Sequence, residues 1–136
     1  MMNGYADFPV VRETFAEAGD ILKQDLWQLV AEGTDAELNA TVNTQPLMLT
    51  AGMAVYRAWQ SLNGPVPQMM AGHSLGEYTA LVAAGAISFA DALPLVRYRA
   101  ECMQQAVPAR RPSPGRTQSG RWRIRCPAAD RRTPGR

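Results

Sequence analysis

A serine enclosed by two glycines restricts this chain to few folds, because it separates two apolar segments of different kinds. The short run at residues 65–72 is apolar and bounded by Pro and Gly, which predicts a buried strand. The small-residue run at residues 77–87 predicts a helix packed closely on its neighbours. Gly-X-Ser-X-Gly between a strand and a helix is typical of a nucleophile elbow, a strained turn that exposes the serine hydroxyl. The alternative is a glycine-flanked turn whose serine is satisfied locally.

The residues around Ser74 have distinct expected roles. Gly72 and Gly76 are structural, because side chains there would collide with the strand and helix that the turn joins. Backbone N–H groups at the start of the following helix favour a developing oxyanion, and Leu75 supplies one of them. His73 is the only histidine of the chain. Adjacent residues on a sharp turn point apart, so we expect His73 to pack beside the elbow and not to act as the base for Ser74.

Apolar spacing and capping residues predict further helices. Residues 7–22 form one with Pro9 in its first turn, residues 25–33 a second that ends at Gly33, and residues 34–40 a single turn capped by Thr34 or Asp35. Residues 43–64 form a long and largely buried helix, capped by Asn43 or Thr44, with Pro46 near its first position and a stop at Asn63-Gly64. Residues 88–106 open with a capping box of Ser88 and Asp91, and Pro94 should kink or break this helix.

Charge divides the chain into two parts. Residues 1–106 contain five Lys and Arg against eleven Asp and Glu, whereas residues 107–136 contain nine Arg against one Asp. The second part also has five prolines among its thirty residues and no apolar period, which predicts a disordered tail. We therefore expect a domain over residues 1–107 and an Arg/Pro-rich tail over 108–136. If residues 108–117 are assumed to be written with CGN codons for arginine and a TCN codon for serine, a shifted reading frame gives mostly small residues in place of the arginines. We hypothesise that the tail is an out-of-frame translation of a GC-rich gene.

Two cysteines imply no disulfide framework, and the chain shows neither a signal peptide nor an apolar run long enough to span a membrane. We expect a cytoplasmic protein.

The string GHSLGEYTALVAAGAISFADAL, which begins at Gly72, resembles the nucleophile region of the malonyl-CoA:acyl carrier protein transacylases. These are the acyltransferases of fatty acid and polyketide synthesis. The resemblance extends from Phe8 to Val107 and includes TQPLMLTA and RAECMQQAVP. Glu77, directly after the second glycine, is typical of these enzymes, whereas esterases and lipases more often place a small residue there.

The resemblance implies that Ser74 takes the malonyl group from coenzyme A as an ester and passes it to the phosphopantetheine thiol of acyl carrier protein. It implies that Arg99 pairs with the malonyl carboxylate, which a planar guanidinium does through two N–H groups. By itself Arg99 is typical of a solvated helix residue. Gln45 matches a glutamine of the active site, or else belongs only to a capping turn. His73 lies on the substrate-binding side, and Leu75 fits malonyl-type enzymes better than methylmalonyl-type ones.

The same resemblance implies a three-layer, hydrolase-like α/β fold with a parallel sheet and flanking helices, of which this chain holds an incomplete core. Family members begin with a strand and a loop whose glutamine completes the oxyanion hole, and their general-base histidine lies far downstream. We expect this chain to lack both and to be inactive alone, since one oxyanion donor is worth on the order of a hundredfold in rate. We also expect marginal stability or aggregation through the exposed faces of the helix at residues 45–62. The expected partners are malonyl-CoA and acyl carrier protein, with no metal, cofactor or membrane.

Two other functions remain open. One is a serine esterase of the α/β-hydrolase type, against which Glu77 and Arg99 argue. The other is a non-catalytic module whose basic tail binds nucleic acid through phosphate contacts. The tail has no repeat and no nucleic-acid motif, which disfavours that function.

Overall fold

The computed structural model describes residues 3–5 and 7–106, and every regular element in these two ranges is a helix. The elements are a short 3-10 helix at Asn3–Tyr5, then α1 (Pro9–Leu22), α2 (Leu26–Glu32), α3 (Asp35–Asn39), α4 (Thr41–Ser61), α5 (Leu75–Ala83) and α6 (Phe89–Ala106). The expected tail at residues 108–136, its disorder and its reading frame lie outside the described residues.

The first three α-helices follow the predicted start and stop signals. Pro9 is the first residue of α1, and the Asp25 side chain caps α2 by accepting a bond from the Gln28 N–H at 2.8 Å. Thr34, and not Asp35, caps α3, through a capping box with Glu37. Hydrogen bonds from the backbone and side chain of Thr34 lower the pKa of the Glu37 carboxyl, because they favour its charged form.

The predicted cap of α4 was wrong. The helix begins at Thr41 with Ala40 as an N-cap that makes no side-chain bond. Asn43 and Thr44 lie in the first turn, where their side chains donate to backbone carbonyls of α3 at 3.0 and 2.6 Å. These bonds to the preceding helix replace the capping role, and Pro46 is left inside α4.

Helices α5 and α6 also differ from the prediction at single positions. Helix α5 ends at Ala83, before the expected residue 87, because Gly85 takes a left-handed conformation with φ of 74°. Half of the predicted capping box of α6 is present: the Asp91 N–H donates to Ser88 Oγ at 3.0 Å, but the Asp91 carboxylate accepts from the Ser88 hydroxyl at 2.6 Å in place of the Ser88 N–H. Pro94 does not interrupt α6. It lies close to the helix start on the exposed side, so the carbonyl freed by its missing N–H can be hydrated.

The predicted strand at residues 65–72 is not formed in the described part of the chain. This segment runs from α4 back to α5 without pairing to another strand, and Val66 and Met69 in it are 71% and 91% exposed. A strand needs a neighbouring strand to satisfy its backbone, and the described residues supply none. The helical part of the expected architecture is therefore seen, and its sheet is not.

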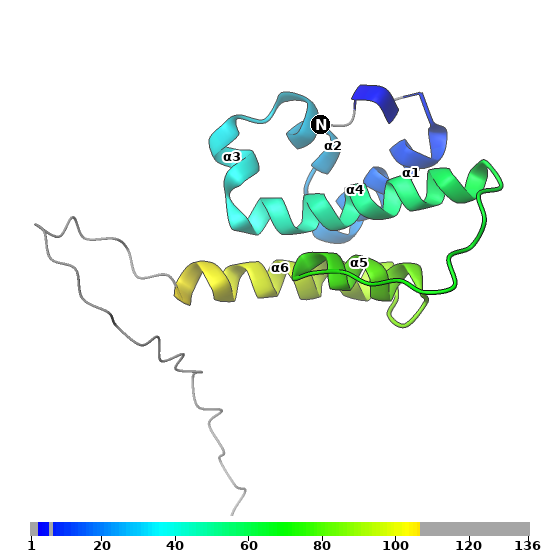
Figure 1. The fold of residues 1–136 in the computed structure, drawn as a ribbon. Helices are drawn as coiled ribbons and strands as arrows, with labels where there is room; N and C mark the ends of the chain where they lie inside the picture. The colour runs from blue at the N-terminus through cyan, green and yellow to red at the C-terminus, as the bar shows by residue number, and fades with distance from the viewer. Residues whose placement is uncertain (1–2, 6, 107–136) are drawn as a thin grey trace, which may run out of the picture.

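The core lies where α4 packs between α1 on one side and α5 and α6 on the other (Figure 1). Large, fully buried side chains of this core come from α1, α2, α4 and α6: Val11, Phe15, Leu26, Leu49, Leu93 and Val96. Within the described residues, no helix combines the length and apolar character that a membrane crossing requires. Because α4 is central, α1 packs on one of its faces and α5 and α6 pack on the other.

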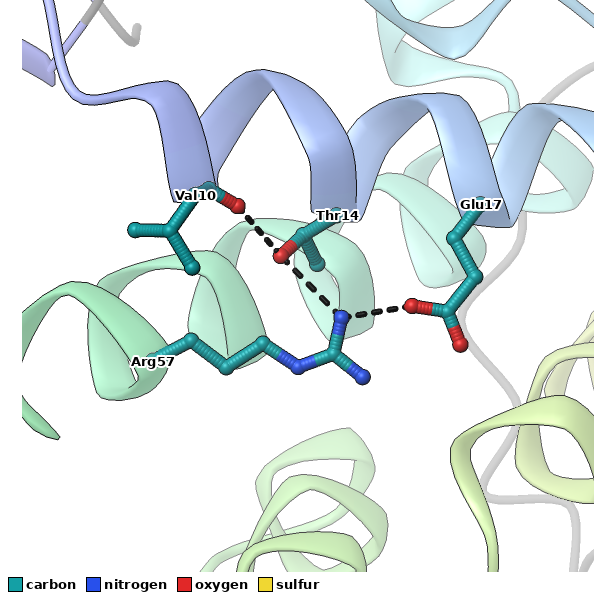
Figure 2. A network of polar contacts seen from close by, with 4 residues as sticks. All are labelled: Val10, Thr14, Glu17 and Arg57. Carbon is teal, nitrogen blue, oxygen red and sulfur yellow. Dashed lines mark hydrogen bonds and ion pairs between the residues drawn. The ribbon is translucent and has the colours of Figure 1, made fainter. Parts of the chain in front are cut away.

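A polar network fixes α4 against α1. Arg57 pairs with Glu17 at 2.6 Å and donates to Thr14 Oγ1 at 3.2 Å, while Thr14 donates to the Val10 carbonyl at 2.7 Å (Figure 2). The Arg57 guanidinium also lies 4.9 Å from the centre of the Phe89 ring on α6. Because the ion pair is partly exposed, it adds little to the free energy of unfolding. Its main effect is to fix the orientation of three helices relative to one another.

Helix α4 is less buried than its sequence predicted, because one side of it carries an apolar stripe that faces solvent. Met48, Val55, Trp59 and Leu62 are 48%, 37%, 48% and 64% exposed, and their spacing places them on one side of the helix. The stripe is followed by the exposed Val66 and Met69 described above. Contiguous exposed apolar surface of this kind favours association.

We expect the 136-residue chain to self-associate through this stripe and the segment after it. The double variant Leu62→Gln/Met69→Gln should shift sedimentation velocity profiles toward the monomer, because it removes two of the most exposed apolar side chains. The matched control is Gln60→Asn/Gln68→Asn, which changes exposed polar residues of the same two segments and should leave the profile unchanged. A monomeric parent chain with a cooperative, reversible melt would contradict the expectation.

Candidate functional site

Ser74 occupies a strained turn between the extended segment and α5. Its backbone has φ of 56° and ψ of −114°, a combination that L-residues rarely adopt. The turn places the serine directly before the first residue of α5 and leaves its side chain exposed. The predicted strained turn with an accessible hydroxyl is thus confirmed.

The glycine before this turn has a clear steric reason. A Cβ on Gly72 would lie 2.0 Å from the carbonyl carbon and oxygen of Gly76 and 2.3 Å from the backbone nitrogen of Glu77. Backbone atoms of a helix start cannot move aside, so only glycine fits. The predicted collision at Gly76 is not found, because a Cβ there meets no described atom within 4 Å apart from its chain neighbours and the backbone of its own helix.

The start of α5 lies next to the serine. The Gly76 N–H donates to the His73 carbonyl at 2.9 Å and the Glu77 N–H to the Ser74 carbonyl at 3.3 Å. In the described part of the chain, the N–H of Leu75 has no hydrogen-bond partner. A free N–H on the residue after a serine nucleophile is what an oxyanion donor requires.

Arg99 joins the serine hydroxyl to a glutamine of the facing helix. Arg99 on α6 donates from Nη2 to Ser74 Oγ at 2.9 Å and from Nη1 to Oε1 of Gln45 at 2.6 Å. Gln45 projects from α4 and is buried, whereas Arg99 is half-buried. The three residues are up to 54 positions apart in the sequence. The structure therefore brings together Gln45, Ser74 and Arg99.

The charge at this site is positive, because the nearest ionisable group to the serine hydroxyl is a guanidinium. Arginine carries five N–H donors, and the contacts to Ser74 and Gln45 engage one on each terminal nitrogen. The remaining N–H groups can pair with a carboxylate through two parallel bonds. The arrangement can therefore hold an anionic group beside the serine hydroxyl.

Sequence reasoning missed two residues here. The ring of Tyr78 lies 5.8 Å from the guanidinium carbon of Arg99, and Met103 Sδ accepts a bond from Gln45 Nε2 at 3.4 Å. Met103 lies four positions after Arg99 on α6, which places it one turn away on the same face, and Tyr78 of α5 lies four positions after Ser74, the residue that precedes that helix. That spacing from Ser74 and from Arg99 was the signal available in the sequence.

His73 is exposed, and its side chain makes no hydrogen bond among the described residues. The expected packing beside the elbow is not seen. The nearest side chain to Ser74 Oγ that the structure identifies is Arg99, which cannot accept a proton. The expectation that His73 is not the base stays a prediction.

The best-formed groove among the described residues lies away from the serine. A groove of about 820 Å³ lies between α1 and α2, lined by Phe15 and Trp27 among others, and includes none of the site residues. Within the described ranges, no cluster of three or more His, Cys, Asp or Glu side chains is placed to hold a metal ion. Ser74 and Arg99 are the polar groups whose contact the structure describes at this site.

Known proteins are similar to this chain in sequence and in the arrangement of its helices. Residues 2–129 match the family described as the acyl transferase domain. The malonyl CoA-acyl carrier protein transacylase of Escherichia coli (strain K12) is 58% identical over 103 residues, which cover 76% of this chain and 33% of that protein. The protein of the same name from Bacillus subtilis (strain 168) is 48% identical over 105 residues, or 77% of this chain and 33% of that protein.

Solved structures agree with these relatives. An acyl-carrier-protein S-malonyltransferase from Burkholderia pseudomallei superposes with a TM-score of 0.76 at 64% identity, over 79% of this chain and 35% of that chain. A malonyl-transacylase solved in complex with its type II PKS acyl-carrier protein gives a TM-score of 0.72 at 56% identity, over 74% of this chain and 33% of that one. The chain thus spans about a third of the length of the proteins that it matches.

Proposed function

This chain belongs to the acyl transferase domain family, and from that membership we propose that its residues form part of a malonyltransferase site. The site transfers a malonyl group from malonyl-CoA to the phosphopantetheine thiol of acyl carrier protein in fatty acid biosynthesis. Both partners are those that the names of the relatives and the solved complex suggest.

The contact between Arg99 and Ser74 is the observation that carries this proposal. A guanidinium nitrogen lies 2.9 Å from the hydroxyl oxygen. In a malonyl thioester, one methylene separates the reacting carbonyl from a free carboxylate. An arginine adjacent to the nucleophile can therefore pair with that carboxylate while the carbonyl faces Ser74 Oγ. An acetyl group offers no such anchor, so the geometry favours the diacid.

In the first proposed step, Ser74 Oγ attacks the thioester carbonyl and gives up its proton to a base. The N–H of Leu75 stabilises the oxyanion, and the intermediate collapses by breaking the carbon–sulfur bond. The coenzyme A thiolate leaves and takes the proton, and Ser74 carries the malonyl ester. The phosphopantetheine thiol then attacks this ester in the same manner and restores the hydroxyl.

Among the described residues, the side chain that contacts Ser74 Oγ is Arg99, and a guanidinium does not accept a proton. The family resemblance implies a histidine as the proton acceptor, and the only one in the chain, His73, makes no side-chain hydrogen bond among the described residues. We assign this role to a histidine outside the 136 residues.

We also propose that residues 65–72 form a strand when a neighbouring strand of a parallel sheet is supplied. We propose in addition that the domain part of this chain is residues 1–107.

A chimera tests the proposal. The 103 matched residues of the Escherichia coli relative are replaced by those of this chain, and transfer of radiolabelled malonyl groups to acyl carrier protein is measured. We expect transfer at a rate comparable to that of the unmodified protein, with a strong preference for malonyl-CoA over acetyl-CoA. A folded chimera that transfers no malonyl group would contradict the proposal. A chimera that only hydrolyses short-chain esters would favour the esterase alternative.

A further inference from the structure

We infer that Met103 is a positioning residue whose sulfur fixes the Gln45 amide and, through it, the direction of the Arg99 guanidinium. The contacts form one continuous chain. Gln45 Nε2 donates to Met103 Sδ at 3.4 Å, Arg99 Nη1 donates to Gln45 Oε1 at 2.6 Å, and Arg99 Nη2 donates to Ser74 Oγ at 2.9 Å. The consequence for acyl transfer rests on the proposed function, whereas the positioning rests on these contacts alone.

The amide of Gln45 lies between two partners of opposite hydrogen-bonding character. A guanidinium has only donors, and a thioether sulfur can only accept. One orientation of the amide satisfies both, with its oxygen toward Arg99 and its NH₂ toward Met103. The reverse orientation would place NH₂ against N–H and oxygen against sulfur. Because Gln45 is only 6% exposed, water cannot readily compensate for the wrong orientation.

The oxygen of Gln45 restrains one nitrogen of Arg99, and Ser74 Oγ restrains the other. Arginine has a long side chain with several rotatable bonds, so two acceptors are needed to hold its plane in one direction. If the amide turns, Nη1 loses its acceptor and the guanidinium is free to rotate away from the serine. The hydrogen bond of Met103 is to Gln45 and that of Ser74 Oγ is to Arg99, so Met103 acts through Gln45.

The position of Met103 on α6 suits this role. It lies one turn after Arg99 on the same face, so both side chains can contact one glutamine of the facing helix α4. Met103 is also 45% exposed, so little core packing depends on it. A change of its sulfur should therefore alter the polar chain with little effect on the fold.

The test uses the 136-residue chain and phenylglyoxal, a dicarbonyl that modifies arginine side chains, with peptide mass spectrometry to follow each arginine. Met103→Leu keeps the size but removes the acceptor, whereas Met103→Gln offers an amide oxygen in its place. Met48→Leu is the matched control, since Met48 on α4 is also about half exposed, at 48%. Arg57, held by Glu17 on the other side of α4, is the internal reference for folding.

We expect Met103→Leu to raise the modification rate of Arg99 by about threefold or more relative to Arg57, because a guanidinium that loses an acceptor is freer to react. Met103→Gln should return the ratio close to the parent value, and Met48→Leu should not change it. An unchanged ratio in Met103→Leu, or no recovery in Met103→Gln, would overturn the inference. So would a joint rise at Arg99 and Arg57, which would show a structural role. Phenylglyoxal reports no acyl transfer, so a chimera without transferase activity would leave this result intact.

Discussion

We expect the substitution Ser74→Ala to abolish malonyl transfer in the chimera, with a loss on the order of a thousandfold or more. The hydroxyl oxygen of Ser74 is the atom that forms the proposed ester, and the methyl side chain of alanine has no nucleophilic atom to replace it. The Arg99 guanidinium can still hold a carboxylate, so binding of malonyl-CoA should be weakened far less than turnover. Transfer of radiolabelled malonyl groups measures the first effect, and equilibrium dialysis with malonyl-CoA measures the second.

The matched control is Ser61→Ala at the end of α4. Ser61 Oγ donates only to the Ala58 carbonyl of its own helix, at 2.8 Å, so its removal should leave transfer unchanged. Helical content by circular dichroism should be the same in both variants. Substantial malonyl transfer by the folded Ser74→Ala chimera would show that another residue carries the acyl group, and the assignment of the nucleophile would be wrong.

The helices of this protein could be predicted because their signals are local. Thr34 and Glu37 form a capping box within four residues, Ser88 caps the start of α6 by accepting from the Asp91 N–H, and Pro9 starts α1. The start of α4 was misplaced because Asn43 and Thr44 bond to carbonyls of α3. A capping preference read from sequence does not show that a neighbouring helix offers those side chains other partners.

Whether the predicted strand at residues 65–72 forms could not be decided from its local sequence. Residues 65–72 have the composition of a buried strand, but a strand forms only with a partner, and the described residues provide none. The elbow differs, because its strain is encoded within a few residues. The positive φ of Ser74 and the space that Gly72 must leave empty both arise inside one turn.

The site was predicted mainly through resemblance. Residue patterns alone indicated Ser74, whereas Gln45 and Arg99 entered because they match a known family. No local rule links Gln45 to Arg99, which is 54 positions later and meets it only because α4 packs on α6. Met103 was missed for the same reason, because its partner belongs to the other helix.

We expect Gly72→Ala to reduce malonyl transfer in the chimera about a hundredfold, because a small misplacement of reacting groups costs that much. The added Cβ would lie 2.0 Å from the carbonyl of Gly76, and backbone at a helix start cannot rotate away as a side chain can. The turn must open, which moves Ser74 Oγ away from the Arg99 guanidinium and the Leu75 N–H. Transfer to acyl carrier protein measures the loss. Phenylglyoxal modification of Arg99 in the 136-residue chain should rise in parallel.

Gly76→Ala is the matched control, since the same methyl group meets no described atom within 4 Å at that position apart from its chain neighbours and the backbone of its own helix. Gly76 lies within α5, where alanine is the better helix former, so this variant should keep the turn and gain slightly in helix stability. Comparing malonyl transfer by the two variants distinguishes the roles of the two glycines of the Gly-X-Ser-X-Gly motif. If both variants lose transfer equally, residues beyond the described part of the chain must crowd Gly76 as well. If Gly72→Ala keeps full transfer, the close approach of Gly72 to the start of α5 is not what holds the serine in place.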